Sequence, residues 1–167
     1  MEVMEAIRTR RSIRKYKPDP VPDDILQDVL NAARLAPSAG NRQPWLFIVV
    51  RDPEVKERMK EVYGAEWFYT APVIIVACGY RDKAWTRSDG KNYMEVDVTI
   101  AMDHLILAAW EKGLGTCWIG AFDPQKAREV LEIPEDAEPV VMTPLGWPAE
   151  QPEAKPRKSL DEIVIYK

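Results

Sequence analysis

Apolar positions along the chain follow two periods, which predict a mixture of strands and helices. Four short apolar runs have the length of strands buried in a sheet, and they cover residues 45–50, 72–78, 116–122 and 139–145. Apolar residues spaced three and four apart predict amphipathic helices over residues 3–9, 23–35, 53–63 and 124–131. A short apolar segment at 160–166 predicts a further strand.

The segment 93–112 is different, because its apolar residues are too many for a single helical stripe. We expect this helix to be buried nearly all round, which in a small chain indicates a second subunit. The only histidine, His104, lies within it, and we expect a core or interface residue there because no catalytic partner is near in the sequence.

Composition limits the class of protein. With 167 residues, 46% hydrophobic and 30% charged, and no internal repeat or linker, the chain predicts one domain over residues 1–167. A net charge of −4 argues against nucleic-acid binding. Cys78 and Cys117 lie in apolar runs without metal-ligand spacing, as expected for thiols in a reducing compartment. No apolar run is long enough for a membrane span, so we expect a cytoplasmic protein.

Residues 8–17 form a local concentration of positive charge, since six of these ten side chains are cationic. Arginine forks beside the hydroxyl of Ser12 suit a phosphate group. The alternative is a solvated basic face of a short helix.

A polar loop over residues 37–44 precedes the first predicted strand. Asn41 and Gln43 each offer a donor and an acceptor, which recognition of a flat heterocycle requires, although local capping of a turn would use the same side chains. Gly120 lies in the third predicted strand, where backbone could approach a ligand. The polar segment 79–92, with Trp85, is a candidate mobile loop, either a cover for a pocket or an ordinary surface loop.

Motifs for side-chain catalysis are missing. The sequence has no Ser/His/Asp arrangement, no HExxH and no carboxylate cluster, and GxGxxG and Walker motifs are also absent. The remaining features, a basic site, an amide-rich loop and a glycine-containing strand, fit a pocket whose cofactor carries the chemistry.

Four ordered segments carry a resemblance that covers essentially the whole chain. They are Arg10-Arg11-Ser12-Ile13-Arg14-Lys15-Tyr16, the loop 36–45, the glycine-rich segment 113–120, and Gly146-Trp147-Pro148 followed by Pro156-Arg157-Lys158. In this order they resemble the FMN-dependent nitroreductase family.

The resemblance implies an α+β, nitroreductase-like fold with a central mixed β-sheet flanked by helices, in an intertwined homodimer with FMN at the interface. Arg10, Arg11, Ser12 and Arg14 would bind the phosphate and the pyrimidine side of the flavin, with Arg157 and Lys158 closing from the tail. The flavin ring would be lined by Pro37, Ser38, Ala39, Asn41 and Gln43, in part from the partner subunit. Ile119 and Gly120 would present backbone N–H groups to flavin N5.

The implied activity is hydride transfer from NADH or NADPH, through flavin N5, to a nitroaromatic, a quinone or a similar small acceptor in a ping-pong mechanism without a catalytic side chain. The alternatives are an FMN enzyme of another reaction type, such as reductive dehalogenation or flavin chemistry, and a flavin-binding module without turnover. A basic-patch interaction protein without a cofactor is a third possibility.

Overall fold

A four-stranded sheet in the order β1-β2-β4-β3 forms the centre of the chain. The computed structural model describes all residues from 1 to 167. The strands are β1 (Trp45–Val50), β2 (Val73–Tyr80), β3 (Gly115–Thr116) and β4 (Ala137–Gly146). The three apolar runs at 45–50, 72–78 and 139–145 are therefore confirmed as strands.

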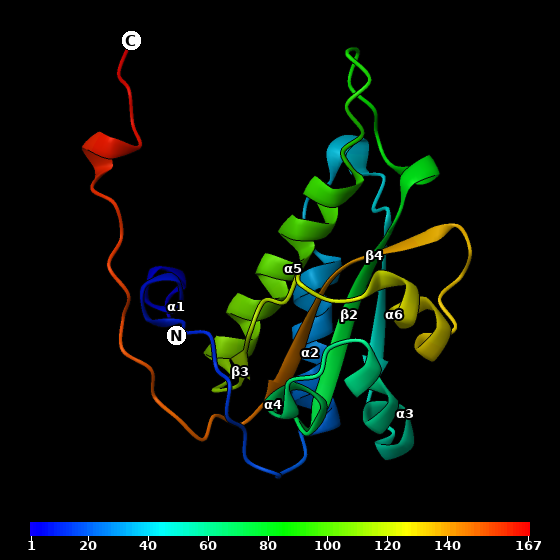
Figure 1. The fold of residues 1–167 in the computed structure, drawn as a ribbon. Helices are drawn as coiled ribbons and strands as arrows, with labels where there is room; N and C mark the ends of the chain where they lie inside the picture. The colour runs from blue at the N-terminus through cyan, green and yellow to red at the C-terminus, as the bar shows by residue number, and fades with distance from the viewer.

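Strand β2 joins two cores because its side chains alternate between the two faces of the sheet. Val73, Ile75 and Ala77 belong to a core with α2 (Asp23–Arg34) and α5 (Met94–Glu111). Ile74, Val76 and Cys78 belong to a second core, with residues from α4 (Glu66–Tyr69) and α6 (Pro124–Leu131) and with Val55 of α3 (Pro53–Arg58) against it. The result is a sheet between two helical layers (Figure 1).

The strand ladders differ from the mixed sheet that the resemblance implies. All three pairings, β1 with β2, β2 with β4 and β3 with β4, are antiparallel. The parallel component is a single bridge between Ser12 and Thr116. It arises because the basic segment runs beside β3 as a short extension of the sheet.

Two of the predicted strands are wrong, one in its extent and one in its type of structure. The segment 116–122 contributes only Thr116 to β3 and a bridge from Ile119 to Met142, because the N–H of Cys117 donates to the hydroxyl of Thr143 at 3.0 Å instead of to the ladder. The segment 160–166 is not a strand, and it begins with a 3-10 turn at Leu160–Glu162 closed by a capping box from Ser159.

The helices follow their apolar patterns with changes at the ends. The predicted helix at 53–63 is α3 followed by a 3-10 turn at Met59–Glu61. Further 3-10 turns lie at Ala39–Asn41 and Arg81–Lys83.

In the single chain, neither α5 nor β1 is buried all round. In α5 the side chain of Val96 is 39% exposed, and Glu95, Thr99 and Asp103 are also exposed. Strand β1 lies at the edge of the sheet and is half-buried up to Val49. No helix is long and apolar enough to cross a membrane.

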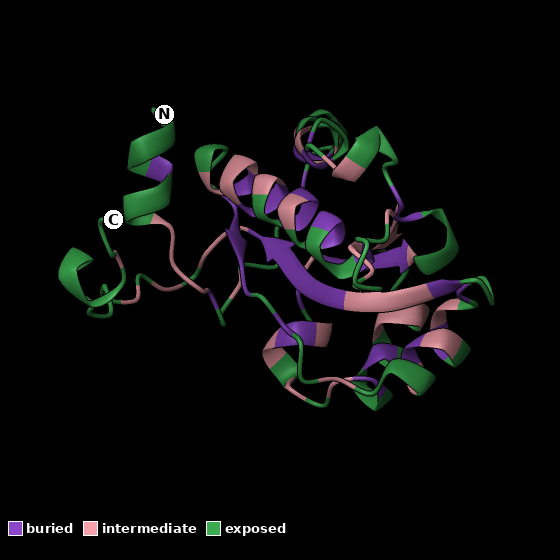
Figure 2. Cartoon of the chain, turned by 90° about the horizontal axis from the view of Figure 1, so that it is seen from above, coloured by how far each residue is buried: buried purple, intermediate pink, exposed green.

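Helix α1 (Val3–Thr9) and the C-terminal tail lie to one side of the sheet (Figure 1). Only Ala6 of α1 is buried, so the helix is almost entirely exposed in Figure 2. Apolar side chains are exposed in both segments, including Val3 at 69%, Ile165 at 83% and Tyr166 at 89%. A group of exposed apolar side chains of this kind marks a candidate contact surface.

The basic segment is joined to the sheet at a tight contact between Ile13 and Gly115. A Cβ atom at Gly115 would lie 2.7 Å from Cγ1 and 2.9 Å from Cβ of Ile13. Because Ile13 is 1% exposed, it has no room to move away.

We therefore expect Gly115→Ala to destabilise the fold by about 1–3 kcal/mol through overpacking. Urea unfolding followed by circular dichroism measures this change. Gly64→Ala is the control, since its Cβ would meet only the Lys60 carbonyl at 3.7 Å. Equal stability of the two variants would contradict the packing argument.

Candidate functional site

A cationic cavity of about 460 Å³ lies between the basic segment and the C-terminal tail. Arg8, Arg10, Arg11, Ser12 and Arg14 line it from the first segment. The tail contributes Pro152, Glu153, Ala154, Lys155 and Arg157. The structure thus brings Arg157 to the basic run as expected, whereas Lys158 does not line the cavity.

The cations of this cavity are not neutralised within the chain. None of its arginines, nor Lys155, forms an ion pair. The guanidinium of Arg11 donates to the carbonyls of Arg8 at 3.0 Å and Arg10 at 2.9 Å, and Arg14 lies 5.9 Å from the ring centroid of Trp67. Such a cluster in an acidic protein favours a multiply charged anion.

Backbone hydrogen bonds fix the basic segment in place. The N–H of Ile13 donates to the Thr116 carbonyl at 2.8 Å, and the Tyr16 hydroxyl donates to the Ile13 carbonyl at 2.6 Å. The carboxylate of Glu150 accepts the Arg14 N–H. Burial raises the pKa of Tyr16 well above its usual value, so its hydroxyl stays protonated as a donor.

The backbone N–H groups of Ile119 and Gly120 differ in their hydrogen bonds. The Ile119 N–H donates to the Met142 carbonyl at 2.9 Å, so the sheet already uses this group. The Gly120 N–H has no such backbone bond, and a Cβ at Gly120 would meet nothing within 4 Å. Of the two residues, only Gly120 therefore has a backbone N–H that is free to bind a ligand.

The amide-rich loop, residues 37–44, is held by local hydrogen bonds. The Ser38 hydroxyl accepts the Gln43 N–H at 2.9 Å, and Gln43 Nε2 donates to the carbonyl of Asn41 at 3.1 Å and to its Oδ1 at 3.2 Å. The side chains of Asn41 and Gln43 nevertheless remain exposed, as does Pro37. The loop therefore has free donors and acceptors on its surface.

The amide-rich loop and the basic cavity lie at opposite ends of the sheet. Strand β1 follows the loop, and its first residue, Trp45, pairs with Gly79 of β2. Gly79 in turn pairs with Glu138 near the start of β4. Ser12 reaches the sheet at Thr116, which pairs with Leu145 near the other end of β4. At ~3.3 Å per residue, these ends are roughly 20 Å apart. One chain thus does not bring its own two groups of predicted residues together.

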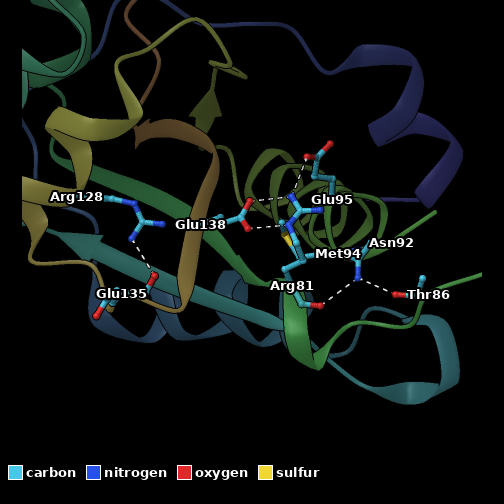
Figure 3. A network of polar contacts seen from close by, with 8 residues as sticks. All are labelled: Arg81, Thr86, Asn92, Met94, Glu95, Arg128, Glu135 and Glu138. Atoms are coloured by element: carbon cyan, nitrogen blue, oxygen red, sulfur yellow. Dashed lines mark hydrogen bonds and ion pairs between the residues drawn. The ribbon is translucent and has the colours of Figure 1, made fainter. Parts of the chain in front are cut away.

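The segment 79–92 is a closed hairpin next to the amide-rich loop. Its base is fixed by Arg81, whose guanidinium donates twice to Glu138 at 2.8 Å, while Asn92 donates to the Arg81 carbonyl at 3.1 Å (Figure 3). The Arg81 hydrogen bond lowers the pKa of Glu138. Trp85 packs edge-on against Tyr93, with ring centroids 5.0 Å apart. The expected mobile loop therefore has a defined, hydrogen-bonded shape.

Three residues near these groups were not identified from the sequence. Arg8 lies in the basic run but is not among the residues predicted to bind the phosphate, yet it lines the cavity together with Lys155. Asp97, which is 1% exposed, accepts the N–H of Ala39 at 3.0 Å. The sequence does contain a signal for the burial of Asp97. Its carboxylate lies between Val96 and Val98, in a helix that is expected to be buried.

An antiparallel sheet between two helical layers, with a cationic cavity at one end, is an α+β architecture suited to a phosphate-bearing ligand. The family model described as the nitroreductase family matches residues 7–67 and 59–147. The chain belongs to the nitroreductase family, and it is an enzyme of that family of oxidoreductases.

Individual relatives cover the whole chain. A protein of Methanothermobacter thermautotrophicus with the provisional name NADH dehydrogenase/NAD(P)H nitroreductase is 39% identical over 100% of this chain and 88% of its own length. The crystal structure of a nitroreductase family protein from Clostridium difficile 630 has a TM-score of 0.92 and 36% identity, over 100% of this chain and 99% of that one. An FMN-dependent nitroreductase from Clostridium difficile R20291 has a TM-score of 0.82 and 30% identity, over 98% of each chain.

Both thiols are expected to react slowly in the native protein. Burial raises the pKa of Cys78 to about 12 and also raises that of Cys117, where burial outweighs the opposing effect of Arg14 and Arg10. At pH 8 each should react with a disulfide reagent more slowly than free cysteine, because the thiolate is the reacting form, and for Cys78 the difference should be at least about tenfold. In denaturant both should react at once. Fast reaction of Cys117 in the native protein would show that Arg14 and Arg10 lower its pKa by more than burial raises it.

Proposed function

We propose that the protein is an FMN-dependent oxidoreductase that transfers hydride from NADH or NADPH to a nitroaromatic, a quinone or a similar small acceptor. The observation that carries the proposal is the cavity of unpaired cations beside Ser12. When bound, FMN would accept hydride from the nicotinamide and deliver it to the second substrate. The two substrates would use the same place in turn.

The residues of the cavity fit the phosphate group of FMN. A phosphate carries up to two negative charges and three acceptor oxygens, which match the guanidinium groups of Arg10, Arg14 and Arg157 and the hydroxyl of Ser12. The cavity volume of about 460 Å³ lies in the range of small-molecule sites. Cations beside a bound ring also favour its negatively charged forms, which would tune its reactivity.

A homodimer would complete the site. The loop with Pro37, Ser38, Ala39, Asn41 and Gln43 lies far from the cavity of its own chain, so we propose that it lines the flavin bound by the partner chain. The exposed Val96 of α5 and the exposed apolar tail support an extensive contact between two chains. The Gly120 N–H would then face the ring from the cavity side.

The double variant Ser12→Ala with Arg14→Ala tests the phosphate site. Removing a hydroxyl donor and a charged donor should weaken FMN binding by at least about 30-fold, at roughly 1–3 kcal/mol for each group. The purified variant should be colourless near the flavin absorbance bands. Lys15→Ala with Lys17→Ala removes more charge from the same run but does not line the cavity, and it should stay yellow. Stoichiometric flavin in the first variant would refute the assignment.

Mixed dimers test whether two chains build each site. One chain would carry Ser12→Ala with Arg14→Ala and the other Asn41→Ala with Gln43→Ala. A shared site leaves one intact site in each mixed dimer, so NADH-dependent reduction should recover toward half of the wild-type rate while both homodimers stay inactive. Activity that remains absent in purified mixed dimers would instead place the site within one chain.

The alternatives separate on further observations. An FMN enzyme of another reaction type would bind flavin and react with NADH or NADPH but would reduce a different acceptor, such as a halogenated aromatic. A flavin-binding module without turnover would keep its yellow colour when either nicotinamide is added without oxygen. An interaction protein that uses only its basic patch would purify without flavin.

A further inference from the structure

A single buried carboxylate connects the amide-rich loop to the helical layer. Asp97 lies in the first turn of α5 and is 1% exposed, and its Oδ1 accepts the Ala39 N–H at 3.0 Å. Aspartate is rarely fully buried unless it is paired. No cation forms an ion pair with Asp97.

The second oxygen of this carboxylate has no protein partner. Asp97 Oδ2 is the one buried side-chain oxygen or nitrogen in the chain without a hydrogen bond. A buried polar group that lacks a partner disfavours the fold by about 1–3 kcal/mol, and more when it is charged. An apolar side chain of similar shape would avoid this penalty, so fold stability alone does not explain an aspartate here.

The loop itself needs to be held in an unfavourable backbone conformation. Gly40, Asn41 and Gln43 have φ values of 61°, 52° and 49°. The left-handed region disfavours each non-glycine residue by ~1 kcal/mol. The turn at Ala39–Asn41 begins at the residue that Asp97 holds. Arg42 provides a second attachment, through its hydrogen bond to the Ala84 carbonyl at 2.9 Å.

We propose that Asp97 is a positioning residue that fixes the amide-rich loop in its ligand-binding conformation. Its Oδ1 accepts the Ala39 N–H, and an apolar side chain at this position would provide no acceptor. This bond sets the start of the turn and thereby the directions of Asn41 and Gln43. The inference rests on the proposed function, in which these side chains line the flavin ring, while Asp97 itself touches neither FMN nor substrate.

A helix-terminus effect is the competing explanation, because acidic residues in a first helical turn interact favourably with the helix dipole. Glu95 lies in the same turn, is exposed and pairs with Arg81 at 3.8 Å, and it provides the comparison for the dipole effect. The dipole explanation gives Asp97 and Glu95 similar roles. Positioning gives only Asp97 a role in ligand binding.

The variants Asp97→Leu, Asp97→Asn and Glu95→Leu distinguish these explanations. FMN titration of the apoproteins should give a dissociation constant at least about tenfold higher for Asp97→Leu, with a changed visible spectrum of the bound flavin. Asp97→Asn keeps an acceptor for Ala39 and should stay within about threefold of wild type, as should Glu95→Leu. The Tm of Asp97→Leu should equal or exceed that of the wild type.

Two results would overturn the inference. One is wild-type FMN affinity and spectrum in Asp97→Leu, and the other is an equal loss in Asp97→Asn and Asp97→Leu. Amide hydrogen exchange of wild-type apoprotein decides the matter even if Asp97→Leu does not fold. Exchange of the Ala39 N–H should be at least about 100-fold slower than in an unstructured chain, and exchange at the unstructured rate would refute positioning.

The same measurements keep the two proposals separate. Wild-type protein that binds no FMN would refute the proposed function, and the exchange rate of the Ala39 N–H would still decide whether Asp97 fixes the loop. Normal FMN binding with no effect of Asp97→Leu would refute the positioning role alone.

Discussion

Helix α5 sets the distance between the two parts of the candidate site. Its 18 residues span ~27 Å, and it packs against the sheet through residues such as Val98, Met102 and Leu105. Its first turn holds the amide-rich loop through Asp97, and its C-terminal end leads directly into β3, where the basic segment attaches. Because this helix packs against the core along its length, it holds the amide-rich loop and the basic segment at its opposite ends.

Burial on both faces of the sheet made much of the fold predictable. Strand β2 reads as a continuous apolar run because each of its faces contacts a separate core. The third predicted strand failed because the Thr143 hydroxyl takes the Cys117 N–H, a side-chain interaction between residues distant in the sequence. The predicted strand in the tail failed because an apolar pattern cannot show that no neighbouring strand is available for pairing.

The site was predictable to the extent that its residues are unusual in sequence. The basic run stands out in an acidic chain, and the paired amides stand out in a loop between two prolines. Lys155 belongs to the cavity because the tail folds back along α1, and no local pattern reveals such a contact. The N–H of Ile119 is engaged by Met142, which depends on strand register. Asp97 resembled a common acidic residue near a helix start until its burial was known.

The left-handed backbone of the amide-rich loop also bears on how tightly a ligand can be held. Asn41 and Gln43 have left-handed backbone conformations, and the backbone hydrogen bonds that Ser38 and Asp97 accept close the turn around them. A loop that is already ordered loses little conformational entropy when it is covered by a flat ring. If the loop lines the ring as proposed, the contacts of its amide groups would contribute to affinity without being offset by the ordering of a flexible segment.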